Sequence, residues 1–155
     1  MITIDLLKNH PDAVPSLAKL WYDLLGHFFA PNLPVKSVEG RFQDHLNSTE
    51  LPITLVALDE GTPVGMCSLR EYDGIRPDLV PWLGSLVVHP DFQKQGIGKL
   101  LIDATKKQAQ AMGFQKLYLF TIQPTKSHYY ERLGWTKIGG DQFEGHPATV
   151  MEIAL

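Results

Sequence analysis

The segment of residues 93–99, QKQGIGK, has the residue types and the spacing of an anion-binding turn. Two glycines, Gly96 and Gly98, stand between an apolar run and a stretch with helical periodicity. The N–H groups at the start of a helix have no acceptor within the helix, and the helix dipole gives them partial positive charge. Glycine lets a ligand approach these groups closely because it has no side chain. We therefore predict that the backbone amides of residues 95–99 bind a diphosphate.

Two common phosphate-binding loops do not fit this spacing. A Walker loop needs a glycine five residues before its Gly-Lys pair and Ser or Thr after it, but the chain has Gln93 and Leu100 there. A dinucleotide-binding fingerprint needs a third glycine three residues after Gly98, where the chain has Leu101. An ordinary strand-to-helix turn, with glycines for packing, is the alternative interpretation.

Two segments of the chain, residues 86–114 around the glycine turn and residues 128–135 around Tyr130, together resemble the GCN5-related N-acetyltransferase (GNAT) family. The first, LVVHPDFQKQGIGKLLIDATKKQAQAMGF, contains that family's Arg/Gln-x-x-Gly-x-Gly/Ala signature. The second, HYYERLGW, resembles its tyrosine on a short helix followed by Leu-Gly-aromatic. The resemblance implies an α/β fold with a central mixed sheet, splayed parallel strands and helices on both faces. It also implies an N-acetyltransferase with acetyl-CoA as cosubstrate.

The resemblance further implies which residues bind acetyl-CoA. The backbone of a bent strand would pair with the pantetheine arm, and the glycine turn would bind the diphosphate. The amide of Val88 would donate to the oxyanion that forms when the thioester is attacked. The cofactor-binding residues are then Leu86, Val87, Val88, Gln93, Lys94, Gln95, Gly96, Ile97, Gly98, Lys99 and Gln123. Gln123 stands where the family often has Asn.

Tyr130 falls on the position of the family's general acid. A hydroxyl within hydrogen-bond reach of the CoA sulfur would protonate the thiolate as it leaves. Taken alone, such a tyrosine is more often a half-buried core residue with a satisfied hydroxyl. Its distance from Gly134 and Trp135 matches the signature and favours the catalytic role. Tyr129 is expected to pack where the family usually has Phe.

The general base is not identified by the sequence. Many members carry a Glu near the position of Gly84 or Ser85, and this chain does not. An amine with a pKa near 10 is only about one part in a thousand uncharged at pH 7, so a group must remove its proton. The candidates are a water held by Ser85 and the side chains of Glu71, Asp73, Glu144 and His146.

Three functions remain in competition. The favoured one is direct attack of an amine on acetyl-CoA in a ternary complex, because Cys67 is expected in the core and no other nucleophile supports an acetyl-enzyme. The second function is a CoA-binding sensor or interaction module without turnover, which is possible because the chain lacks the Glu that many members carry near position 84 or 85. A nucleotide-binding domain is the third, weakened by the failed loop spacings.

The acceptor is expected to be an amine-bearing small molecule or peptide. In the family the acceptor pocket is built by the first two helices and the final hairpin loop, here residues 28–41 and 139–147. These segments and their surroundings combine aromatic with ionisable side chains, which favours an amine with an apolar or aromatic part: Phe28, Phe29, Trp82, Phe143, Asp141, Glu144 and His146.

Composition restricts the class of protein. The 155 residues suit one domain, 1–155, and a net charge of −3 argues against a nucleic-acid partner. One cysteine indicates a reducing, cytoplasmic location, and no apolar run is long enough to cross a membrane. The histidines form no HxxxH or HxH pair, so no metal is expected. The resemblance alone implies a homodimer through the terminal strands.

The elements that must position these residues follow from hydrophobic periodicity. Two strands that are apolar on both faces, 82–88 and 116–122, flank a helix over 98–112 that buries Leu100 and Leu101 and stops at Gly113, as in a parallel βαβ unit. Thr125 is expected to cap a helix that ends at Gly134. Further strands are expected at 1–6, on both sides of a turn at 60–63, at 135–138 and at 148–154. Helices are expected over 10–26 and 38–46, and loops at 28–34 and 139–147.

Overall fold

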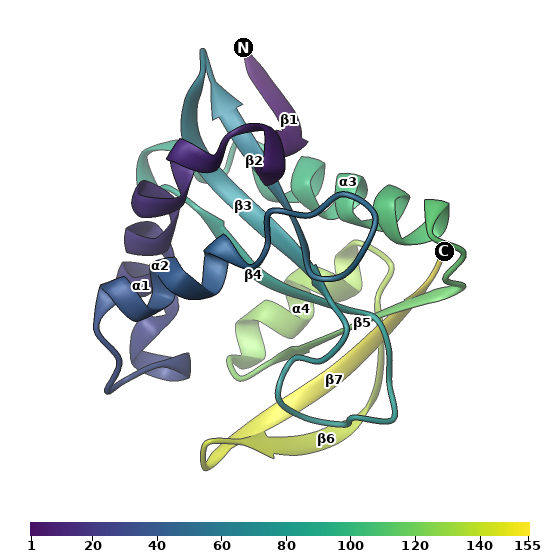
Figure 1. Cartoon of the computed structure of the whole chain (residues 1–155). Helices are drawn as coiled ribbons and strands as arrows, with labels where there is room; N and C mark the ends of the chain where they lie inside the picture. Colours follow the sequence, from purple (N-terminus) through teal and green to yellow (C-terminus); the bar gives the residue numbers. More distant parts are fainter.

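A seven-stranded mixed sheet forms the centre of the molecule, in the strand order β1-β2-β3-β4-β5-β7-β6 (Figure 1). This computed structural model describes residues 1–123 and 125–155 in full, and Pro124 by its backbone only. Among the strands of the described residues, only β4 and β5 pair in parallel. The strands are β1 Ile2–Leu6, β2 Ile53–Asp59, β3 Thr62–Arg70, β4 Trp82–Val88, β5 Lys116–Thr121, β6 Thr136–Phe143 and β7 His146–Ala154.

Helices cover both faces of this sheet. Helices α1 (Val14–Phe29) and α2 (Val35–Gln43) pack on one face, and α3 (Ile97–Ala111) and α4 (Pro124–Arg132) on the other (Figure 1). Because both faces are covered, consecutive residues of a central strand are both apolar. In β2, Leu55 joins the core under α3, whereas Val56 joins the core under α1. Burying one such aliphatic side chain stabilises the fold by about 1.5–3 kcal/mol. The predicted mixed α/β fold with helices on both faces is confirmed.

Strand β4 is bent at one residue and separates from β5 soon after it begins. Its register against β3 shifts by one residue between the pairs Ser68↔Gly84 and Met66↔Val87. Ser85 has a φ of 53°, the left-handed backbone expected of a bulge. The parallel pairing with β5 is restricted to one residue pair, Trp82↔Tyr118. The carboxyl ends of the two strands therefore diverge.

The structure corrects several predicted boundaries. Residues 28 and 29 belong to α1, so the predicted loop at 28–34 starts too early. Helix α4 is capped at Gln123 without a side-chain hydrogen bond, so the predicted Thr125 cap is wrong. The predicted loop at 139–147 is mostly strand, with β6 and β7 joined at Glu144 and Gly145. Leu100, predicted to face inward, is 46% exposed.

A buried polar cluster joins the end of α2 to the sheet. His45 Nδ1 lies 2.7 Å from Thr54 Oγ1, which lies 2.7 Å from Ser68 Oγ. Burial, together with the nearby charges of Arg70 and Arg41, lowers the pKa of His45 to about 3. The folded protein therefore holds this imidazole neutral at pH values where an unfolded chain protonates it.

Acid should consequently destabilise the protein through His45. Between pH 6.5 and about 3, only the unfolded chain takes up this proton, so the free energy of unfolding falls by about 1.4 kcal/mol per pH unit from this group. Urea unfolding at pH 7 and pH 5 should show a loss about 2 kcal/mol larger in the native protein than in His45→Asn. Equal losses in the two proteins would contradict this origin.

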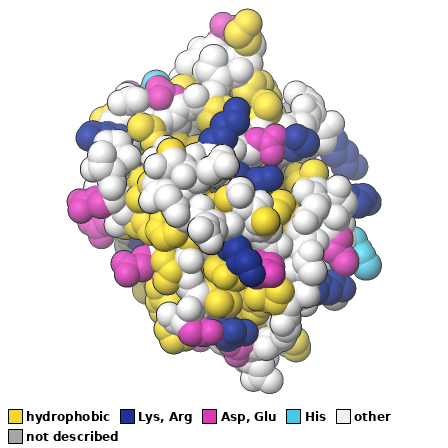
Figure 2. Space-filling model, turned by 90° about the vertical axis from the view of Figure 1, so that its right-hand side faces the viewer, with side chains coloured by type: hydrophobic (Ala, Val, Ile, Leu, Met, Phe, Trp, Pro, Cys, Tyr) yellow, Lys and Arg dark blue, Asp and Glu magenta, His cyan; other side chains and the backbone are white. Residues whose placement is uncertain are grey.

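Charges of both signs alternate over the surface that includes the end of α3. In Figure 2 lysines and arginines lie in small groups beside aspartates and glutamates, and no single sign dominates this face. No helix among the fully described residues has the length and apolar character needed to cross a membrane. Strand β6 is an exposed sheet edge, and the homodimer through terminal strands stays a prediction.

Candidate functional site

A cavity of about 720 Å³ occupies the gap between the diverging ends of β4 and β5. Its walls come from α1, the bulged part of β4, the turn before α3, the end of β5 and the start of α4. The cavity is continuous from the glycine turn, through Tyr130, to Asp73 and the end of α1. Open α/β sheets bind ligands where neighbouring strands separate at their carboxyl ends, and this cavity lies at such a point.

The glycine turn presents open backbone amides at one end of this cavity. Gly96 is the N-cap of α3 with a φ of 83°, which strongly favours glycine, and a Cβ placed on it would meet no atom within 4 Å. The first backbone hydrogen bond of the helix runs from Leu100 N to Gly96 O, at 3.1 Å. Among the described residues, no acceptor is paired with the amides of residues 95–99. They are available to a ligand.

The side chains of the turn have two roles: one fixes the turn to β4, and others bring positive charge to the cavity. Gln93 Nε2 donates to Val88 O at 2.9 Å, which ties the turn to the end of β4. Lys94 and Lys99 line the cavity, and Lys126 of α4, which sequence reasoning missed, adds a third positive charge there. The sequence did not indicate a role for Lys126, because α4 and the glycine turn are distant in the sequence and come together only when the chain folds. The remaining predicted residues Ile97, Gly98 and Gln123 line the cavity, whereas the side chain of Gln95 is exposed outside it.

The bulged strand contributes the long wall of the cavity. Leu86, Val87 and Val88 all line it. His89 N donates to Val64 O of β3 at 2.7 Å. Because successive amides of a strand point in opposite directions, the Val88 amide points away from β3 and toward the gap.

Tyr130 lines the cavity from α4. It is 8% exposed, and its ring lies edge-on to Tyr129 and Trp135, with centroids 5.3 and 5.9 Å away. Burial raises the pKa of its hydroxyl, so the phenol stays protonated at neutral pH. The hydroxyl of Tyr129 reaches the start of α3, 3.1 Å from where a Cβ on Gly98 would lie. Its phenol is thus placed beside the open amides.

Asp73 supplies a carboxylate at the bent part of β4, although it comes from the β3–β4 loop. Arg70 Nη1 donates to Asp73 Oδ1 at 2.8 Å, and Arg70 Nη2 donates to Ser85 Oγ at 2.6 Å. A Cβ on Gly84 would lie 3.0 Å from both carboxylate oxygens, so the carboxylate occupies the space of a side chain at position 84. Burial raises the pKa of Asp73, partly offset by the charge of Arg70.

Three of the other base candidates lie outside this cavity. Glu71, Glu144 and His146 are exposed and do not line it. The ring of His146 packs edge-on against Phe28, at 6.1 Å between centroids. Ser85 also lines the cavity, and its hydroxyl oxygen accepts a hydrogen bond from Arg70 Nη2. Asp73 is the only carboxylate among the candidates that lines the cavity.

Two further residues are excluded from direct chemistry by burial. Cys67 is fully buried, and burial raises the pKa of its thiol to about 12, so it is not a thiolate nucleophile. Trp82, predicted to line the acceptor pocket, is fully buried beside Tyr118 and Phe120 instead. No group of His, Cys, Asp or Glu side chains in the described part of the chain is arranged to hold a metal ion.

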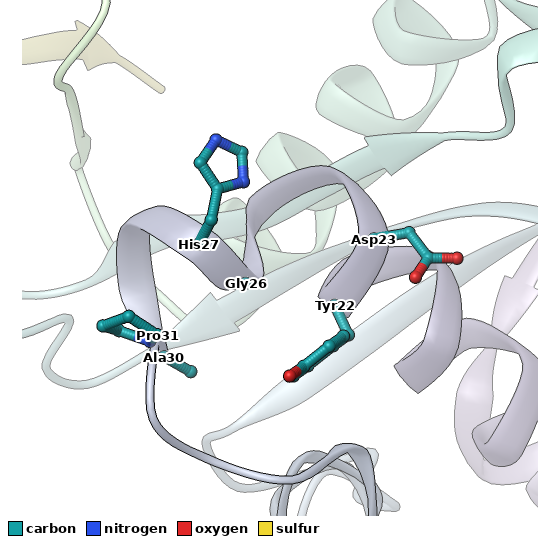
Figure 3. Close-up of a pocket in the computed structure, with 6 residues that line it drawn as sticks. All are labelled: Tyr22, Asp23, Gly26, His27, Ala30 and Pro31. Atoms are coloured by element: carbon teal, nitrogen blue, oxygen red, sulfur yellow. The ribbon is translucent and has the colours of Figure 1, made fainter.

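A second hollow lies along the C-terminal half of α1. It measures about 280 Å³ and is lined by residues around Tyr22, Asp23 and His27. Figure 3 shows that the side chains of Asp23 and His27 leave the helix in different directions, so they do not converge on a common point. This arrangement offers no shared ligand position.

Comparison with known proteins adds context to this geometry. A family model described as "Acetyltransferase (GNAT) family" matches residues 18–135. No curated protein matches the sequence. An aminoglycoside 6'-N-acetyltransferase complexed with coenzyme A is similar in structure, with a TM-score of 0.75 and 19% identity over 99% of this chain and 96% of that chain.

Two other solved structures show a comparable likeness. A GNAT-family acetyltransferase from Streptococcus pneumoniae has a TM-score of 0.71 and 20% identity, over 100% of this chain and 99% of that chain. A spermidine N-acetyltransferase chimera from Vibrio cholerae and hSSAT has a TM-score of 0.74 and 19% identity, over 99% and 95%. At these identities the likeness shows the fold.

Proposed function

The chain belongs to the acetyltransferase (GNAT) family, and from that premise we propose that it is an N-acetyltransferase. Residues 1–155 form one domain that moves the acetyl group of acetyl-CoA to an amine. The observation that carries this proposal is the single cavity that joins open amides at the start of α3 to Tyr130 and Asp73. A diphosphate carrier bound at one end would place its thioester between an acid and a base.

Acetyl-CoA binds along the length of the cavity. The amides of residues 95–99 hold its diphosphate, helped by the α3 dipole and by the charges of Lys94, Lys99 and Lys126. Its pantetheine arm fills the gap between the strands, against the backbone of Leu86, Val87 and Val88 and beside Gln123. The thioester carbonyl then points toward the free amide of Val88.

The reaction is direct attack within a ternary complex. Asp73 accepts the proton that the amine must lose, and the nitrogen lone pair forms a bond to the thioester carbon. The Val88 amide stabilises the oxyanion. As the C–S bond breaks, Tyr130 donates its proton to the sulfur, and the second proton that the nitrogen loses restores the phenol through solvent. The products are the amide, CoA thiol and one proton, which Asp73 passes to water. Cys67 takes no part because its buried thiol is protonated.

Mixing the protein with acetyl-CoA and a panel of amines tests this proposal. CoA binding by calorimetry and release of thiol above the rate without amine should both be observed. If CoA binds and no amine releases thiol, the protein is a CoA-binding module. If CoA does not bind, or ATP binds in its place, the assigned cavity is wrong.

Removing the Tyr130 hydroxyl should slow transfer without weakening CoA binding. A CoA thiol has a pKa near that of cysteine, about 8.5, so it can leave without full protonation. We therefore expect Tyr130→Phe to lower kcat about tenfold, which is below the range of about 100-fold to 10,000-fold that is typical of general acid–base catalysis. Calorimetry should give the same Kd for CoA in both proteins. An unchanged kcat in steady-state assays would remove Tyr130 from the mechanism.

The Tyr129 hydroxyl should contribute to binding through the diphosphate alone. It lies at the start of α3, so it can donate to a phosphate oxygen, and such a charge-assisted bond is worth about 1.5–3 kcal/mol. We expect Tyr129→Phe to raise the Kd of CoA about tenfold or more. The affinity for pantetheine, which lacks the diphosphate, should not change. An equal loss for both ligands would indicate a packing role for Tyr129.

A further inference from the structure

We infer that the acceptor is a small monoamine whose ammonium group is attached to a flat apolar body, as in an arylalkylamine. This inference rests on the transfer reaction proposed above and concerns the end of the cavity beyond Tyr130. Two features of that end carry it: a wall of phenylalanine rings and a single carboxylate.

The wall is built from rings that lie far apart in the sequence. Phe28 and Phe29 of α1 and Phe120 of β5 line the cavity. The centroids of Phe29 and Phe120 are 6.0 Å apart, and Phe143 of β6 packs behind both, at 5.2 and 5.4 Å. Tilted and edge-on rings at these distances form a continuous apolar surface. A flat hydrocarbon body can bury itself against this surface.

The wall is held in place before any ligand binds. Phe120 packs edge-on against the fully buried Trp82, at 6.1 Å between centroids. Phe143 lies so close to Gly74 that a Cβ there would be 2.7 Å from its ring. Leu24 and Leu25 extend the apolar surface along α1. Little ordering of side chains therefore opposes the binding of an apolar group.

The charges along the cavity point to one ammonium group. Asp73 is the only acidic side chain among the described residues that line it, whereas Lys94 and Lys99 belong to the glycine turn and the first turn of α3, and Lys126 to α4. Arg70 pairs with Oδ1 of Asp73, so a bound ammonium is compensated at Oδ2 of the same carboxylate. A second ammonium on the same molecule would lie against phenylalanine carbon, where it loses its water without gaining a partner.

Polyamines and aminoglycosides are therefore poor acceptors for this pocket. Spermidine and aminoglycosides are named for two of the similar solved structures, and both carry several amines. Each amine beyond the first needs a carboxylate or solvent, and the described walls of the acceptor end supply only Asp73. The aromatic wall favours hydrocarbon in the same place.

Rates of thiol release with acetyl-CoA test this inference directly. The amines compared are phenethylamine, ethylamine, spermidine, kanamycin and a short peptide with an N-terminal phenylalanine. Burial of the phenyl ring should make kcat/KM for phenethylamine at least about 30-fold higher than for ethylamine. The same or a larger ratio is expected over spermidine and kanamycin.

Two substitutions of one wall residue assign the preference to this pocket. Phe28→Leu should lower the ratio of phenethylamine to ethylamine about threefold to tenfold, because part of the contact is lost. Phe28→Glu should lower it further and raise the relative kcat/KM of spermidine, because it adds a second carboxylate. Phe114→Leu changes a half-buried ring that does not line the cavity, so it should leave the ratios unchanged.

The outcomes separate the two proposals. Thiol release with a higher kcat/KM for spermidine or kanamycin would overturn the acceptor class and leave acetyl transfer standing. A peptide acceptor more than tenfold better than phenethylamine would overturn the small-molecule assignment. CoA binding with no release for any amine would overturn the transfer reaction and this inference with it.

Discussion

Gly96→Leu is expected to raise the Kd of CoA at least about 100-fold, a loss of about 2.8 kcal/mol of binding energy. The new side chain would enter the open space beside the unpaired amides of residues 95–99, where the diphosphate must approach. A leucine at this position would also have to adopt the left-handed backbone conformation of Gly96, which lowers the free energy of unfolding by about 1–2 kcal/mol. That cost is small against a typical stability of about 5–15 kcal/mol, so the variant should fold.

Gly113→Leu is the matched control for this substitution. Gly113 follows the other end of α3, has a φ of 92°, and a Cβ on it would meet no atom within 4 Å. The backbone strain is therefore the same, but Gly113 does not line the cavity. Isothermal titration calorimetry should show native CoA affinity for Gly113→Leu. Equal losses in both variants would mean that the turn acts through stability and not by binding the diphosphate.

The turn was predictable because its information is local. The glycine spacing, the apolar run before it and the helical period after it lie within about thirty residues. The structure places Trp82–Val88 as expected and begins α3 at Ile97, one residue before the predicted start. Tyr130 follows for the same reason, since the distance to Gly134 is set within one short helix. Backbone geometry of this kind depends little on the rest of the chain.

The acceptor end was less predictable because it depends on contacts between distant segments. The sequence predicted that α1 ends at Gly26, but the helix continues to Phe29. Phe28 and Phe29 continue its apolar spacing. What holds Phe29 in place is Phe143, whose ring lies 5.2 Å away although it follows more than a hundred residues later. Asp73 is similar, because only the path of the β3–β4 loop brings it over Gly84. A single sequence contains no local signal for either contact.

Asp73→Asn is expected to lower kcat/KM for the amine by about 100-fold to 1,000-fold, the usual range for loss of a general base. Asparagine retains the shape and can still accept from Arg70, but it cannot take up a proton. CoA does not contact this end in our assignment, so its Kd should stay native. Glu71→Gln removes a nearby exposed carboxylate and should have little effect.

The pH dependence gives this prediction a second readout. Asp73 acts as a base only above its pKa, and burial raises that pKa above the ordinary value of 3.8. Activity of the native protein should thus fall on acidification at a higher pH than an exposed aspartate would give. Ionisation of the amine affects both proteins equally. The ratio of the native rate to the Asp73→Asn rate therefore reports the protonation of Asp73 alone. A ratio independent of pH would contradict the assignment.

Moving the carboxylate should restore activity if its position is what matters. The oxygens of Asp73 lie 3.0 Å from a Cβ placed on Gly84, so a glutamate grown from position 84 would reach the same space once Asp73 is gone. Asp73→Ser combined with Gly84→Glu should be at least about tenfold more active than Asp73→Ser alone. Gly84→Glu by itself should lose activity, because two carboxylates would compete for one site. If the double variant is no better than Asp73→Ser, Arg70 holds Asp73 for structure and the base lies elsewhere.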